Sequence, residues 1–133
     1  MNYVKINGKS FDVGVAISNY EEHFNVLDGS AAGRSKIGRM IRDVIGTYIG
    51  HNITFFNKGG EAGNAAFDEL WDFLKAHSVD DSVMLEAADG QGQIKYEAYY
   101  TSGSRRIRNA SGGVNYWDDL QISFIPMEAQ ITP

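Results

Sequence analysis

Residues 37–56, which read IGRMIRDVIGTYIGHNITFF, decide the fold because their pattern fits two different structures. The apolar residues from Ile37 to Ile49 are spaced three and four apart, as on one face of a helix. Three glycines weaken a helix here, and the stretch holds five Ile, one Val and two Thr, which are β-branched residues that favour strands. We predict a strand interrupted near Gly46 or Gly50, with a helix as the alternative.

The sequence before this stretch predicts a β-hairpin. From Tyr3 to Asn7 the side chains alternate between polar and apolar, and Asn7-Gly8 is a pair typical of tight hairpin turns. A second alternating run, residues 11–18, places Phe11 and every second residue after it on one face. The two runs should therefore pair with each other.

Residues 19–36 are polar, contain several glycines and show no sustained period, so we expect a long early loop. A loop of this length inside a small domain is usually functional. Its larger apolar and aromatic residues need burial, which a neighbouring subunit would provide. These residues are Tyr20, Phe24, Val26 and Leu27.

One helix is predicted over residues 65–77, after Asn64, whose side chain is expected to cap its first turn. The expected apolar face consists of Phe67, Leu70, Trp71 and Leu74. This face should cover a sheet.

The second half of the chain otherwise predicts strands. Residues 83–88 and 93–101 are expected to form a hairpin around the turn at 89–92, and residues 103–113 a loop or a short edge strand. Residues 116–125 should form the last strand, with a bulge at the two aspartates 118 and 119. The tail after Pro126 is expected to be loose or bound to a partner.

The composition fits one domain of α+β class, mainly β. The chain has 133 residues, 43% of them hydrophobic, and no Cys. We expect an antiparallel β-sandwich or open barrel with one flanking helix. The absence of Cys excludes disulfides and thiolate chemistry. The start of the chain lacks the apolar core of a secretory signal, and the sequence has no apolar run of membrane-spanning length, so we expect a protein made in a cytoplasm and not bound to a membrane.

The sequence offers no catalytic, cofactor or metal motif, and we expect no enzyme. Glu21, Glu22 and His23 are adjacent, so their side chains diverge, and His51 and His77 lack the spacing of metal ligands. The glycine pairs match no nucleotide-binding fingerprint. Catalytic residues, cofactors and metals are therefore predicted to be none.

Two basic clusters stand out in a chain of net charge −5. Because the whole chain is acidic, contact between subunits is a better explanation for these clusters than nucleic-acid binding, with an ordinary solvated surface as a further alternative. The clusters are Arg34, Lys36, Arg39 and Arg42, and then Arg105, Arg106 and Arg108.

Several phrases taken together resemble small tail proteins of phages and prophages of Gram-positive bacteria. They are YVKINGKSFDV at the start, GRSKIGRMIRDVIGTYIGHNITFF after the polar insertion, FDELWDFL, YEAYY, and the closing YWDDLQISFIPME. The likeness lies in the order and type of these phrases and covers nearly the whole chain.

This resemblance implies a structural component of the virion tail, of the tail-tube and baseplate lineage, assembled in the cytoplasm of the bacterial host. It implies a ring of identical subunits, a hexamer, that contacts other tail or baseplate proteins and lets DNA pass without binding it specifically. Residues 19–36 would reach onto the neighbouring subunit. The expected interface residues are Tyr20, Phe24, Val26, Leu27, Arg34, Arg39, Arg105, Arg106 and Arg108.

The alternative function is a small carbohydrate- or ligand-binding β-module. Aromatic residues make up 12% of the chain, and aromatic rings stack on sugars. The candidates for such stacking are Tyr99, Tyr100, Tyr116 and Trp117.

Overall fold

A computed structural model describes residues 4–133 and shows a mainly β protein with one α-helix, as predicted. Tyr3, the predicted start of the first strand, lies outside the described residues. The elements are β1 (Lys5–Ile6), β2 (Gly14–Val15), the 3-10 turn η1 (Ile17–Asn19), β3 (Glu21–Asp28), β4 (Gly33–Arg34), β5 (Met40–Ile41), β6 (Val44–Phe56), α1 (Gly60–Ala76), β7 (Val83–Asp89), β8 (Gly92–Tyr99), β9 (Gly103–Ser111) and β10 (Val114–Pro126).

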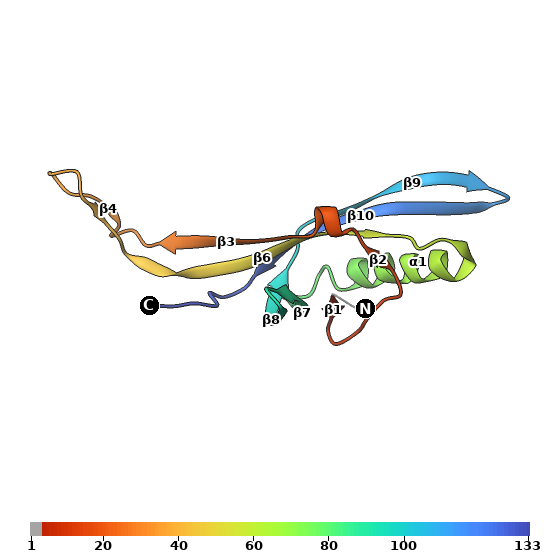
Figure 1. Ribbon diagram of the computed structural model, residues 1–133, viewed down its shortest axis with the longest axis horizontal. Coiled ribbons are helices and arrows are strands. Elements are labelled where there is room, and N and C mark those ends of the chain that lie inside the picture. Colours follow the sequence, from red (N-terminus) through yellow and green to blue (C-terminus); the bar gives the residue numbers. More distant parts are fainter. Residues whose placement is uncertain (1–3) are drawn as a thin grey trace.

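Eight strands of the described chain form one curled antiparallel sheet in the order β1-β7-β8-β10-β6-β2, with β3 also paired to β6 and β9 to β10. β6 and β10 are 13 residues long and pair with each other only in their C-terminal halves, from Leu120 opposite Phe55 to Phe124 opposite His51. Their outer halves pair with β3 and β9. Two long hairpins therefore leave the body in opposite directions (Figure 1).

We call residues 21–49 the arm and residues 29–43 within it the arm tip. The arm consists of β3, the tip with its small β4–β5 ladder, and the outer half of β6. Residues 19–36 were predicted to be a loop, and this is wrong, because residues 21–28 form a strand paired along its whole length with β6. Pairing with a strongly β-forming neighbour satisfies the backbone of a polar segment that has no strand pattern of its own.

The prediction of a strand over most of residues 37–56 is confirmed by β5 and β6, but the predicted interruption is wrong. Gly46 and Gly50 lie inside an unbroken β6. A Cβ on Gly50 would stand 2.9 Å from the carbonyl oxygen of Phe124, and one on Gly46 2.5 Å from the Cβ of Ala129. These glycines mark places where neighbouring chain packs against the strand.

The predicted N-terminal hairpin is wrong beyond its turn. Asn7 and Gly8 have positive φ, and Ile6 and Lys9 exchange two backbone hydrogen bonds of 3.0 Å across them. The chain then separates, because β1 pairs with β7 and β2 with β6. Asn7 reinforces the first pairing, since its side-chain oxygen accepts a hydrogen bond from the backbone N–H of Met84.

Helix α1 lies on the sheet and buries Phe67, Leu70 and Leu74, as predicted. It begins at Gly60, so the predicted start at residue 65 and the Asn64 cap are wrong. The Asn64 side chain instead accepts a hydrogen bond from the Asn57 amide at 3.2 Å. The core residues outside the helix are Val4, Ile6, Ile53, Phe55, Val83, Leu85, Ala87, Tyr96, Ala98, Leu120, Ile122 and Phe124.

The strands of the second half agree with prediction in order and place. The β7–β8 hairpin is confirmed, residues 103–111 form a nine-residue edge strand, and the register of β10 shifts between Asp118 and Gln121, where Asp119 has a φ of 54°. The predicted bulge is thereby confirmed.

The C-terminal tail is not loose. The side chain of Gln130 accepts from the backbone N–H of Ile49 and donates to its carbonyl oxygen, both at 2.9 Å. The backbone of Ile131 pairs with Thr47. The tail thus satisfies the edge of β6 at the point where β10 turns away toward β8.

Candidate subunit interface

One face of β6 is covered in the body and uncovered along the arm. His51, Ile53 and Phe55 point to the core and are buried. Because side chains alternate in a strand, Ile49 and its cross-strand partner Phe24 lie on the same face. Phe24 is 70% exposed and Val26 on the same face is 44% exposed. Part of the arm therefore continues the core face without a covering layer.

The arm tip is apolar and basic. Ile37 occupies a turn in which the Gly38 N–H donates to the Ser35 carbonyl oxygen at 2.9 Å, and the side chain of Ile37 is 89% exposed. Arg34 donates to the Gly38 carbonyl oxygen at 3.0 Å, which braces this turn. Arg42 forms an ion pair with Asp28. Lys36 and Arg39 are exposed beside Ile37.

The nine predicted interface residues fall into two groups. Phe24, Val26, Leu27, Arg34 and Arg39 gather on the arm, and Arg106 lies exposed on β9. The second group consists of the three remaining residues, whose side chains are engaged within their own chain. Tyr20 accepts a hydrogen bond from the backbone N–H of Ala88 through its hydroxyl, Arg108 pairs with Asp118, and Arg105 is held near Asp68.

Arg105 connects the helix to the sheet. Its guanidinium lies 4.8 Å from the ring centroid of Trp71 and 4.5 Å from that of Trp117, and it pairs with Asp68 at 2.8 Å. Stacking between two indole rings stabilises a cation at a partly buried site. Arg105 therefore contributes to the packing of α1 on the sheet within one chain.

The two outer strands carry opposite charges. Within residues 4–133, β3 pairs with β6 alone and β9 with β10 alone, so each leaves one edge without a strand partner. The charged residues of β3 are Glu21, Glu22 and Asp28, whereas those of β9 are Arg105, Arg106 and Arg108. Asp28, Arg105 and Arg108 form ion pairs within the chain, so Glu21 on β3 and Arg106 on β9 are the exposed charges at the two borders of the sheet.

A buried polar cluster fixes the base of the arm to the body. The His51 Nε2 lies 3.0 Å from the Ala88 carbonyl oxygen and 3.2 Å from Glu22, and its Nδ1 lies 2.7 Å from the Tyr96 hydroxyl. Because a carbonyl oxygen only accepts, we assign the proton to Nε2, so Nδ1 accepts from Tyr96. Sequence reasoning missed this cluster, since its members are far apart in the chain.

The electrostatics of this cluster favour neutral groups. Burial lowers the pKa of His51 and raises that of Tyr96. Burial and a hydrogen bond with Asp89 raise the pKa of Glu22. The carboxylate of Glu22, the imidazole of His51 and the hydroxyl of Tyr96 follow one another as in an acid–base triad. However, the hydroxyl of Tyr96 is buried in the core. The arrangement ties four strands together, namely β3, β6, β7 and β8.

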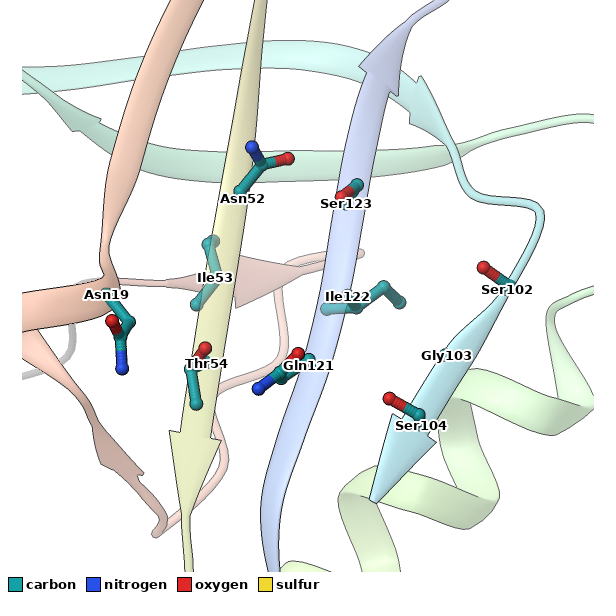
Figure 2. Close-up of a pocket in the computed structure, with 10 residues that line it drawn as sticks. All are labelled: Asn19, Asn52, Ile53, Thr54, Ser102, Gly103, Ser104, Gln121, Ile122 and Ser123. Carbon is teal, nitrogen blue, oxygen red and sulfur yellow. The ribbon is translucent and has the colours of Figure 1, made fainter. Parts of the chain in front are cut away.

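A polar hollow of about 420 Å³ lies on the sheet beside this base. Figure 2 shows Asn52 and Thr54 on β6, Gln121 and Ser123 on the neighbouring β10, and the serines 102 and 104 around Gly103. These are uncharged hydrogen-bonding groups. The aromatic residues proposed for sugar stacking do not line this hollow, and the hydroxyl of Tyr100 donates to the Leu74 carbonyl oxygen within the chain.

No group of three metal-ligating side chains occurs within residues 4–133. Among the same residues, no helix combines the length and the apolar character that crossing a bilayer requires. No protein-family model matches the chain, and no curated protein matches its sequence. The resemblance to tail proteins therefore stays a prediction from the sequence.

Proposed function

We propose that the protein is a non-enzymatic structural subunit that joins head to tail with copies of itself into a ring. The observation that carries this proposal is that β3 and β9 lie at opposite borders of one sheet and each leaves one edge without a strand partner within residues 4–133. Exposed strand edges are hazards in a monomer, and pairing removes them.

The strand directions suit such an assembly. β9 is antiparallel to β10, β10 to β6, and β6 to β3. Antiparallel pairing of β3 with β9 of the next copy continues this alternation without a break. A head-to-tail contact of this kind closes into a ring when its rotation divides the circle. The exposed Glu21 on β3 and Arg106 on β9 have opposite charges, which favours a β3–β9 contact over β3–β3 and β9–β9 contacts.

The arm supplies apolar area for the same contact. A stable interface buries at least about 1,000 Å² in total, and the apolar residues of the arm offer surface that its own chain does not cover. Within this proposal, the role is that of a tail component of a phage or prophage, as tail tube, tail terminator or baseplate subunit. The net charge of −5 suits a channel that does not bind passing DNA.

The decisive experiment replaces Phe24 and Val26 together by Asp and measures the solution mass by light scattering. Both side chains are exposed in the monomer, so we expect the fold to persist by circular dichroism and the ring to be lost. The matched control is Met127→Asp, because Met127 is 42% exposed, comparable to Val26, but follows β10 beside β8, away from β3 and β9. Normal assembly of the arm variant would refute the proposal.

A second test addresses the edges. Arg106→Glu reverses an exposed charge on β9 and should weaken assembly, most strongly at low salt. Lys95→Glu, the same change on β8 away from both edges, should leave assembly unchanged. Electron microscopy of the wild-type assembly should show rings with an open centre.

The polar hollow supports a second candidate function, the binding of an uncharged polyhydroxyl ligand such as a carbohydrate. Its amide and hydroxyl groups can donate to and accept from sugar hydroxyls. A glycan array with wild-type protein and a Gln121→Ala variant tests it. Binding to one glycan class that is lost in the variant would favour this function.

A further inference from the structure

A groove of about 500 Å³ lies between the second half of α1 and the connection from β8 to β9. Trp71 and Leu74 line it from the helix, and Tyr100 from the connection. The Tyr100 hydroxyl donates to the Leu74 carbonyl oxygen at 2.6 Å, and Arg105 stacks on Trp71. These contacts fix both aromatic rings, so the groove is a preformed apolar surface.

The same chain carries an apolar side chain that suits this groove. Ile37 projects from the hydrogen-bonded turn at the arm tip and is almost fully exposed. Within residues 4–133 the side chain of Ile37 is left uncovered, and the arm extends away from α1 (Figure 1). Burying an Ile side chain stabilises a contact by about 1.5–3 kcal/mol.

The charges around the two features are complementary. Lys36 and Arg39 flank Ile37, and Arg34 lies one residue before that turn. The outer face of α1 and the loop after it carry mostly acids, with Lys75 the exception. These acids are Asp68, Asp72, Asp80 and Asp81, and they outnumber the two cations beside the groove, Lys75 and Arg105. A basic tip is therefore attracted to the acidic surroundings of the groove.

The proposed edge pairing also leads the tip toward the groove. When β3 pairs antiparallel with β9 of a neighbour, the Asp28 end of β3 lies toward the Gly103 end of β9. The chain that follows Asp28 is the arm tip, and the chain that precedes Gly103 forms one wall of the groove. Pairing of the edges and insertion of the tip are thus parts of one contact.

We propose that the groove beside α1 receives the arm tip of the neighbouring copy, with Ile37 inserted against Trp71 and Tyr100. This inference rests on the proposed self-assembly and names the receiving site. The partner is a second copy of this chain, and each copy both gives a tip and receives one.

The absence of Cys allows a direct test by cross-linking. Ile37→Cys is combined with Ser78→Cys, an exposed position at the margin of the groove, and the assembled protein is oxidised. We expect a ladder of covalent oligomers on a denaturing gel, because each copy links to the next. Either single variant should give no species larger than a dimer.

The matched control combines Ile37→Cys with Ser111→Cys, an exposed serine at the far end of β9. This control variant should give no ladder. A ladder as strong as that of the variant with Ser78→Cys would overturn the proposal. If light scattering shows that the variant with Ile37→Cys and Ser78→Cys still forms a ring but oxidation gives no ladder, the groove assignment fails while self-assembly stands. If the wild type is a monomer at all concentrations, the proposed function itself fails.

A second variant measures the energetic role of the tip. Ile37→Asp should weaken assembly at least tenfold, whereas Ile37→Leu should largely preserve it, since Leu keeps the apolar volume. Equal assembly of the Asp variant and the wild type would contradict insertion of Ile37. Neither change affects a buried residue, so circular dichroism should show an intact fold.

Discussion

The two halves of β6 differ in what covers them. In the half that crosses the body, His51, Ile53 and Phe55 lie beneath other elements and are buried. In the half that forms the arm, the same face continues through Ile49 and its partner Phe24, and Phe24 is mostly exposed. One strand thus has a core in one half and an unpartnered apolar surface in the other. Within the proposed assembly, the neighbouring copy covers this surface.

The largest expected effect compares a core residue with an arm residue. Phe67→Ala should lower the free energy of unfolding by about 3–5 kcal/mol, because it removes a fully buried ring and leaves a cavity. Phe24→Ala should change it by less than about 0.5 kcal/mol in the monomer. Chemical denaturation of both variants at low protein concentration measures the difference. A large loss for Phe24→Ala would mean that the arm is already packed in the monomer.

A smaller effect is expected where the two halves of β6 meet. Gly50→Val should destabilise the monomer by about 1–3 kcal/mol, since its Cβ would meet the Phe124 carbonyl oxygen and the His23 ring. Gly33→Val at the arm tip is the control, because a Cβ there meets nothing within 4 Å. Equal stability of the two variants in thermal unfolding would show that β6 and β10 do not approach closely at this point.

The smallest effect concerns pH at the base of the arm. The pKa of Glu22 is raised in the folded state, so its ionisation opposes folding as the pH rises above about 4.5. Glu22→Gln removes this penalty, so the stability of the variant relative to wild type should increase from acid to neutral pH. Glu21→Gln, on the opposite face of β3, serves as control. A relative stability that falls with pH would contradict the burial of Glu22.

The pKa of His51 is lowered in the folded state, so its contribution to stability changes with pH in the opposite direction to that of Glu22. The unfolded state binds more protons below the ordinary value of 6.5, so the stability that neutral His51 contributes is lost as the pH falls below 6.5. Both glutamate variants keep His51, so its contribution to the pH dependence of stability is the same in each. The difference between the two variants therefore reports the contribution of Glu22.

Local pattern predicted much of the fold. The apolar face of α1, the β7–β8 hairpin and the bulge at Asp118 each follow from spacing within a short window. β3 and β9 could not be predicted as long strands, because their own side chains are largely polar and only a paired neighbour makes them strands. The start of α1 was missed because Gly59 and Gly60 look like a turn and both have positive φ, although Gly60 is the first residue of the helix.

The candidate interface was predicted in part. Phe24, Val26 and Leu27 were identified because large apolar residues in a polar segment need burial, and the structure leaves them exposed on the arm. Arg105 and Tyr20 were assigned to the same surface, but each contacts its own chain. A sequence gives the charge and size of a side chain, whereas the residues that surround it depend on segments far away in the chain.

The sequence by itself determined the mainly β class, the position of the helix face, the turns and the absence of cysteine chemistry, because these depend on neighbouring residues. Only the tertiary structure decided that β3 and β9 are opposite edges of one sheet, that His51 is buried against Tyr96, and that Gln130 closes the edge of β6. Each of these contacts joins residues distant in sequence, and its energy depends on pairing and burial that no local pattern records.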